Sequence, residues 1–267
     1  MCSSDLRGEF SGGALGLKSI KKNIYLILTK ALGLYQGLIW QASSQYENQD
    51  ISRQMGKQAN NIFIAPDLPS AIPDLPENRP FHPSSPTPTL KIIFLSRISP
   101  MKNLDFALSV LAQTKVSVQF DLFGNISDNS YWSECKHLIE QLPKNIKVYY
   151  KGVIPHQEVI TTFAQYDLFF LPTKGENYGH VIYESLAAGT PALISDQTPW
   201  RDFEKYGAGW VLPLNNMNNF IDCIESFYAA DPEEKHLKRK KAREYAVNVN
   251  KNSITLKANQ ALFLRAL

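Results

Sequence analysis

The stretch from Asp167 to Ile194 constrains the fold most. An apolar run at 167–171 (DLFFL) and another at 192–194 flank a helical pattern that extends from about Gly179 to Ala188. Short apolar runs joined by a helix are typical of buried, parallel strands. Gly189 and Pro191 follow the helical pattern, as expected where a helix ends. The stretch therefore predicts a strand–helix–strand unit within a parallel sheet.

The same alternation continues through the chain from Leu90 onward. We expect strands at 91–96, 116–123, 146–151, 167–171, 192–195 and 209–212. We expect helices at 103–113, 130–142, 156–165, 179–188, 200–206, 217–229 and 233–246. This order predicts an α/β fold, a doubly wound, Rossmann-like parallel sheet with helices on both faces. Such sheets bind ligands at the carboxyl ends of their strands.

Residues 1–66 form a second, shorter pattern. A helix is expected at 15–34, short strands at 37–42 and 61–65, and a helix that follows the candidate N-caps Ser43 and Ser44. Residues 66–89 hold eight of the sixteen prolines, which predicts a linker at 67–89 between this domain and one at 90–246. A final helix is expected within 247–267. No strand precedes the first helix, so we expect the chain to begin in the middle of a domain.

Two segments leave alternatives open. The helix at 15–34 has an apolar side, with lysines at 18, 21, 22 and 30, and could pack on a protein core or rest on an anionic membrane. The run at 235–243 (KHLKRKKAR) could be a solvated helix face or a contact with an anionic polymer or membrane.

Composition and missing motifs exclude several functions. The net charge of +3 is too small to indicate nucleic-acid binding, and three cysteines without metal-like spacing favour a reducing compartment. No run of eighteen apolar residues occurs. The sequence lacks a G-x-G-x-x-G motif after a strand, a G-x-x-x-x-G-K-[ST] motif and a clustered ligand set. We therefore expect that the protein is not a nicotinamide dehydrogenase or a P-loop NTPase, and that it binds no metal.

Charged residues follow two of the predicted strands. Arg97 and Lys102 come after the strand at 91–96 and could be surface cations or could bind a diphosphate. A helix that starts at Gly179 offers free N–H groups to an anion. Glu176 lies before this helix and Glu184 on its second turn, so both carboxylates could face the same ligand. Together the two loops favour a diphosphate site on one edge of the sheet.

With these residues in place, the chain resembles a known family. Residues 90–214 are similar to the C-terminal, donor-binding lobe of retaining glycosyltransferases of the GT-B fold, family 4. The matching pieces are the loop with Arg97 and Lys102, KGVIP at 151–155, YDLFFLPT at 166–173, the Glu-x7-Glu motif and AAGTPAL at 187–193. Residues 7–65 resemble, less specifically, the end of the N-terminal, acceptor-binding lobe. The resemblance implies a fragment of a longer enzyme whose final helix returns to the N-terminal domain.

The resemblance also implies roles for individual residues. Arg97, Lys102 and Glu176 would be catalytic: the two cations stabilise the leaving diphosphate, and Glu176 contacts the donor sugar. Glu184 would hold the ribose hydroxyls. The remaining donor-binding positions would be the helix start and the base pocket, namely Tyr178, Gly179, His180, Val181, Val153 and Ile154. His180 could be read as a general base, but we favour a role for its backbone N–H.

The expected function is transfer of a sugar from a nucleotide-diphosphate sugar, with retained configuration and without a metal or other cofactor. The expected acceptor is a polysaccharide, a lipid-linked sugar or a small molecule, and no nucleic acid is involved. The expected location is the cytoplasm, with a peripheral contact at the inner face of the membrane as an option. Alternatives are a fragment that binds nucleotide sugars without catalysis, and another GT-B enzyme such as a sugar-nucleotide epimerase.

Overall fold

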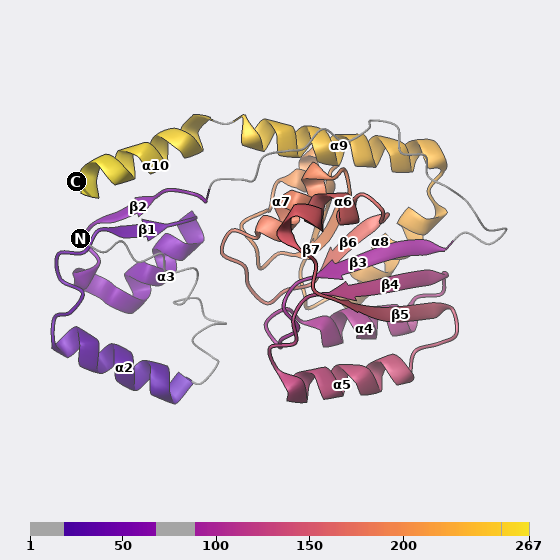
Figure 1. Ribbon diagram of the computed structural model, residues 1–267, viewed down its shortest axis with the longest axis horizontal. Coiled ribbons are helices and arrows are strands. Elements are labelled where there is room, and N and C mark those ends of the chain that lie inside the picture. The colour runs from indigo at the N-terminus through magenta and orange to yellow at the C-terminus, as the bar shows by residue number, and fades with distance from the viewer. Residues whose placement is uncertain (1–18, 68–88, 252, 267) are drawn as a thin grey trace. The chain divides into compact units, whose positions relative to one another are not determined.

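The computed structural model describes residues 19–67, 89–251 and 253–266. The chain forms two compact units (Figure 1). The first unit comprises Met1–Pro69, Gly175–Gly179 and Lys251–Leu267. The second comprises Ser70–Lys174 and His180–Asn250. Each unit is described by itself.

A six-stranded parallel sheet forms the centre of the second unit. Its strand order is β5-β4-β3-β6-β7-β8, and every neighbouring pair is parallel. The strands are β3 (Leu90–Leu95), β4 (Val118–Phe123), β5 (Ile146–Gly152), β6 (Leu168–Leu171), β7 (Ala192–Ser195) and β8 (Gly209–Leu212). The predicted doubly wound α/β fold is confirmed.

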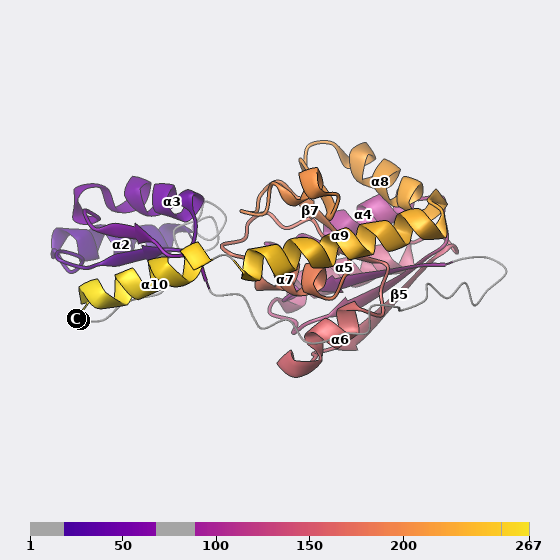
Figure 2. The same cartoon turned by 90° about the horizontal axis from the view of Figure 1, so that it is seen from above.

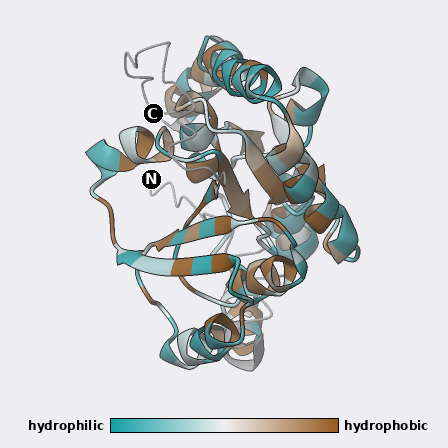
Figure 3. Cartoon of the chain, turned by 90° about the vertical axis from the view of Figure 1, so that its right-hand side faces the viewer, coloured by the Kyte–Doolittle hydropathy of each residue, from teal (hydrophilic) through white to brown (hydrophobic). Residues whose placement is uncertain are grey.

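Helices cover both faces of this sheet. On one face α4 (Leu104–Gln113) packs against α5 (Asn129–Glu140) and α8 (Met217–Ala229). On the other, α7 (His180–Ala187) packs against α6 (Val159–Phe163) and α9 (Pro232–Asn250) (Figures 1 and 2). All residues of β6 and β7 are buried, and Figure 3 shows strands of the sheet in brown between helices with teal, hydrophilic stretches. The apolar runs at 167–171 and 192–194 are therefore core strands.

Two predicted helices are wrong in extent. The helix expected at 200–206 is a 3₁₀ turn, η3 (Phe203–Tyr206). At the start of the expected helix, Trp200 N donates to Thr198 Oγ1. At its end, Gly207 stops the turn with a φ of 71°. The helix expected at 156–165 divides into η2 (His156–Glu158) and α6, because Glu158 N donates to the Pro155 carbonyl in an i, i+3 turn.

The basic run on α9 is not simply a solvated face. Lys235 is buried, and its Nζ donates to the Tyr228 carbonyl at 2.8 Å. Arg239 donates to the Tyr166 and Ala164 carbonyls at 2.7 and 3.1 Å, and Arg243 to the Ala187 carbonyl at 2.8 Å. These three cations satisfy carbonyls at the ends of neighbouring elements, so half of the run is structural.

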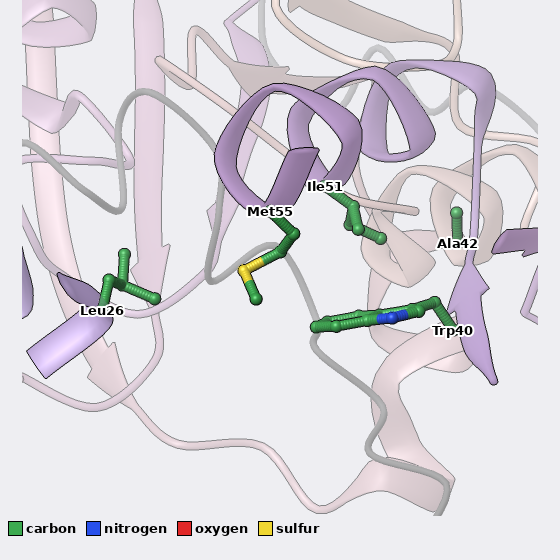
Figure 4. Close-up of a cluster of buried hydrophobic side chains, with 5 residues drawn as sticks. All are labelled: Leu26, Trp40, Ala42, Ile51 and Met55. Atoms are coloured by element: carbon green, nitrogen blue, oxygen red, sulfur yellow. The ribbon is translucent and has the colours of Figure 1, made fainter. Parts of the chain in front are cut away.

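The first unit contains a two-stranded parallel sheet, β1 (Trp40–Ala42) with β2 (Ile62–Ile64). The strand expected at 37–42 is thus shorter than predicted. Around the sheet lie α2 (Ser19–Ala31), α3 (Gln45–Met55), η1 (Gly56–Gln58) and α10 (Ser253–Ala266). Its hydrophobic cluster joins one residue of α2 to residues of β1 and α3 (Figure 4): Leu26, Trp40, Ala42, Ile51 and Met55.

Two polar features stabilise this first unit. Ser44 is the N-cap of α3 and accepts a hydrogen bond from Glu47 N at 3.2 Å, while Glu47 Oε2 accepts one from Ser43 N at 2.7 Å. On α10, Asn259 Nδ2 donates to the Pro66 carbonyl at 2.8 Å, and the Arg265 guanidinium lies 4.5 Å from the centroid of the Phe63 ring. The final helix thereby belongs to the first unit.

Two of the expected segments fall partly outside the described residues. Of the helix expected at 15–34, residues 15–18 are outside, and the described part ends at Ala31. The predicted linker at 67–89 lies outside except for Asp67 and Thr89. The described part of the first helix buries Leu26 but exposes other apolar side chains, at Ile24, Tyr25, Ile27 and Leu28.

Candidate functional site

The candidate site lies where the strand order of the sheet reverses. From β3 the chain proceeds outward through β4 to β5, and then returns to pair β6 with the opposite side of β3. Ligands of open α/β sheets bind beyond the carboxyl ends of the strands at such a switch point. The loop after β3 carries Arg97 and Lys102, and the loop after β6 leads to α7. The topology therefore brings the two predicted loops to the same edge.

Hydrogen bonds hold these two loops together. The Met101 carbonyl accepts from Lys174 N at 2.8 Å and from Thr173 Oγ1 at 3.2 Å. Asn103 Nδ2 donates to the Pro172 carbonyl at 2.9 Å. Ser195, at the end of β7, donates its hydroxyl to the Thr173 carbonyl at 2.5 Å. The carboxyl ends of β3, β6 and β7 are thus one connected edge.

A glycine that sequence reasoning missed lets another loop approach this edge. Gly124 follows β4 with a φ of 132°, and a Cβ placed there would lie 2.0 Å from the Ser96 carbonyl oxygen. Next to it, Ile98 pairs with Ile126 in an isolated parallel bridge. The signal in the sequence was a glycine directly after a buried strand. The loop after β4 therefore packs against the backbone on both sides of Arg97, and Gly124 permits this close approach.

The two cations at this edge differ in exposure. Arg97 is exposed, whereas Lys102 is buried, with 8% of its surface exposed. Lys102 lies in a turn before α4: its N–H donates to the Ser99 carbonyl, and the helix expected at 103–113 begins at Leu104. The N-cap, Asn103, has a left-handed φ of 61° and uses its side chain for the loop contact instead of a cap.

Helix α7 begins at this edge and ends as predicted. Gly179 precedes it with a φ of 79°, which favours glycine. His180, its first residue, is exposed, and Val181 is half-buried. At the other end Gly189 has a φ of 74°, and Thr190 N bonds back to the Ser185 carbonyl at 2.9 Å. The first-turn N–H groups have no partner within a helix and can serve an anion.

The segment between Lys174 and His180 belongs to the first unit. It contains Glu176, Tyr178 and Gly179, so these three predicted site residues are not placed against those of the second unit. Within the first unit, Asn177 Nδ2 donates to Glu47 Oε1 at 3.0 Å.

Glu184 is the buried carboxylate of the site. Its side chain is 8% exposed, and His156 Nδ1 lies 3.6 Å from Oε1. Burial raises the pKa of Glu184, while the charges of His156 and His180 lower it. His156 follows β5 and was not predicted, because a lone histidine after a strand is a weak signal. The structure brings His156, in the turn η2, together with Glu184, on helix α7.

The predicted base-pocket residues lie after β5. Val153 is 69% exposed and Ile154 is half-buried. An apolar side chain that is as exposed as Val153 can receive the face of a ring.

The described residues, 19–67, 89–251 and 253–266, contain neither a cluster of metal ligands nor a membrane-spanning helix. No group of three or more His, Cys, Asp or Glu side chains in them is arranged to hold a metal ion. Among their helices, none is both long and apolar enough to cross a membrane.

Comparison with known sequences gives two partial relatives. One is an uncharacterized 41.2 kDa protein in the cps region of Klebsiella pneumoniae, 24% identical over 160 residues, 60% of this chain and 42% of that protein. The other is the processive diacylglycerol alpha-glucosyltransferase of Acholeplasma laidlawii, 28% identical over 124 residues, 46% of this chain and 36% of the enzyme. The chain therefore matches less than half the length of either.

Solved structures share the fold. HepE of Anabaena in complex with UDP-glucose matches with a TM-score of 0.69 at 18% identity, over 91% of this chain and 67% of that one. TarM of S. aureus, in a complex that includes UDP, also scores 0.69 at 18% identity, over 84% of this chain and 43% of that one. Both are GT-B proteins, which confirms the predicted fold class.

A family model provides the assignment. The model described as "Glycosyl transferases group 1" matches residues 77–246, which is more than half of the chain and contains the whole sheet of the second unit. The chain therefore belongs to the glycosyl transferases group 1 family.

Proposed function

We propose that the second unit binds a nucleoside-diphosphate sugar, and that the protein transfers the sugar to an acceptor hydroxyl with retained anomeric configuration. The observation that carries the proposal is the switch-point edge. There, Lys102 and the start of α7 follow adjacent strands, in loops tied together by the bonds of Met101 and Asn103. A position of this kind favours an anionic ligand.

The proposed chemistry needs charge stabilisation more than covalent catalysis. The bond between the anomeric carbon and the diphosphate oxygen breaks, and the acceptor oxygen bonds to that carbon. The acceptor's proton passes to the leaving diphosphate. Arg97, Lys102 and the first N–H groups of α7 would stabilise the negative charge that develops, at about 3 kcal/mol per contact. This assigns a backbone role to His180 and Val181, and no metal is required.

The remaining roles follow the family resemblance. Glu184 would accept hydrogen bonds from ribose hydroxyls, because an ionised carboxylate is a strong acceptor. Glu176 would contact the donor sugar, and Tyr178 and Gly179 would lead into the helix start. Val153 and Ile154 would contact the base. HepE, whose complex contains UDP-glucose, and the glucosyltransferase of Acholeplasma laidlawii support a hexose donor.

A transfer assay tests the proposal. The protein, in its longest native form, is incubated with radiolabelled UDP-, GDP- or ADP-sugars and membrane or polysaccharide fractions as acceptors. Lys102→Ala and Glu184→Ala should each lower the transfer rate by roughly 100-fold. Glu158→Ala, an exposed glutamate of η2, is the matched control and should keep the rate. Unchanged rates in both site variants would contradict the proposal.

Two alternatives give different results in the same assay. Nucleotide binding without transfer would indicate a binding module. This alternative is considered because the chain matches less than half the length of either relative. Conversion of the sugar nucleotide without an acceptor would indicate an epimerase. Binding and transfer together select the glycosyltransferase.

The acceptor and the location remain proposals. The acceptor is a polysaccharide, a lipid-linked sugar or a small molecule, in keeping with relatives named for a cps region and for diacylglycerol. Cytoplasmic location is proposed from the cysteine pattern, and Cys135 and Cys223 are free and buried. A peripheral membrane contact through the first helix stays a prediction, which sedimentation with anionic vesicles would test.

A further inference from the structure

Glu184 is a buried carboxylate whose acceptor capacity the protein leaves unused. Its side chain is 92% covered, since 8% is exposed. No residue in the described part of the chain donates a hydrogen bond to either of its carboxylate oxygens. Buried carboxylates are normally hydrogen-bonded or paired, because their desolvation is costly. The unused acceptors therefore suit a ligand that brings its own donors.

His156 is the side chain that approaches this carboxylate, and it forms an ion pair with it when protonated. Its Nδ1 lies 3.6 Å from Oε1, which is within ion-pair range but too long for a direct hydrogen bond. The imidazole is 72% exposed, so the pair lies at the boundary between the interior and solvent. An ion pair with one partner this exposed contributes little to folding. The pairing of His156 with Glu184 is therefore poorly explained by a contribution to folding stability.

The loop around His156 is well fixed although the side chain is exposed. Pro155 precedes it with a φ of −58°, and Glu158 N donates to the Pro155 carbonyl at 2.9 Å. Its neighbour Val159 is buried and opens α6, which packs against α7, the helix of Glu184. The backbone therefore holds the imidazole near one carboxylate oxygen while the other remains available.

We propose that His156 is a positioning residue of the donor site, which keeps the Glu184 carboxylate ionised and oriented to accept the 2′- and 3′-hydroxyls of a nucleotide ribose. The inference rests on the proposed function. Burial opposes the ionised form of Glu184, and a protonated carboxyl would lose acceptor capacity. A protonated His156 offsets this effect, with a smaller contribution from His180.

Isothermal titration calorimetry with paired nucleotides tests this role. UDP, GDP and ADP, each beside its 2′-deoxy form, are titrated into the whole chain. For the ribonucleotide that binds, His156→Ala should weaken binding about tenfold, because charge-assisted hydrogen bonds weaken. For the 2′-deoxy form the loss should be clearly smaller. His156→Lys, which restores a cation, should recover part of the affinity.

Two controls separate positioning from a general structural effect. Gln157→Ala, an exposed neighbour in η2, should bind as the unmodified chain does. In a Glu184→Gln background, His156→Ala should have no further effect, whereas a structural role would still weaken binding there. Equal ribonucleotide binding by the unmodified chain and His156→Ala would overturn this inference alone. Failure of the unmodified chain to bind any of the three nucleotides would overturn the proposed function as well.

Discussion

Each of the two units contains a buried glutamate, and the two differ in how they are satisfied. Glu47, in the first unit, accepts hydrogen bonds from Ser43 N, Ser43 Oγ and Asn177 Nδ2 at 2.7, 2.7 and 3.0 Å. Glu184, in the second, has His156 at 3.6 Å and no hydrogen-bond donor among the described residues. Glu47 is satisfied by its own fold, and Glu184 is not. The difference distinguishes a structural carboxylate from one reserved for a ligand.

The two units also differ in the size of their sheets and in how completely their apolar side chains are buried. The second unit has six parallel strands covered on both faces. In the described part of the first unit, only two strands pair, and α2 leaves Ile24, Ile27 and Leu28 more than half exposed. Two-stranded sheets are marginally stable by themselves. We therefore expect the second unit to be the more stable one.

A pair of core substitutions gives the largest expected effects. Phe170→Ala, in β6, removes a fully buried ring that contacts Phe120 and Phe220, and should cost about 4 kcal/mol. Ile51→Ala in the first unit should release only the amides of β1, β2 and α3. Hydrogen exchange by mass spectrometry measures both. If Ile51→Ala lowers the protection of β3 and β6 as much as that of β1, β2 and α3, the two units unfold together.

A pair of glycine substitutions has a smaller effect. Gly124→Ala would bring a Cβ to 2.0 Å from the Ser96 carbonyl, and should destabilise the second unit by roughly 3 kcal/mol. Gly37→Ala, in the first unit, has a φ of 75° but nothing within 4 Å of the added carbon, and should cost about 1 kcal/mol. Urea unfolding compares them. Equal costs would mean that the loop beside Arg97 can shift freely.

The two glutamates give the smallest change but opposite signs. Glu47→Gln loses charge-assisted hydrogen bonds and should cost about 1–2 kcal/mol. Glu184→Gln should stabilise the protein at neutral pH, because burial raises the pKa of Glu184 and ionisation then favours unfolding. The gain should be small at about pH 4, where the carboxyl is mostly protonated in both states, and should grow as pH rises.

Thermal melts of both variants at pH 4 and pH 7.5 check this pair. A Glu184→Gln variant that is less stable than the unmodified chain at pH 7.5 would show that the His156 contact outweighs burial. That result would remove the distinction between the two carboxylates.

The fold was predictable because strong local patterns agree with it. The apolar runs became β6 and β7, and Gly189 ended α7 as expected. Non-local contacts explain the errors. Arg239 and Arg243 looked solvated because their carbonyl partners are more than fifty residues away in sequence. His156 was missed for the same reason, since Glu184, which it approaches, lies on a separate element, helix α7. Lys102 was found, but its burial depends on tertiary contacts.

Binding of a nucleoside diphosphate to the switch-point edge tests the account most directly. Calorimetry with UDP, GDP and ADP should show that at least one of them binds the unmodified chain. Lys102→Ala should weaken that binding about tenfold, whereas Lys147→Ala, an exposed lysine of β5, should not change it. Absence of binding by all three, or equal binding by Lys102→Ala, would contradict a diphosphate site between β3 and β6.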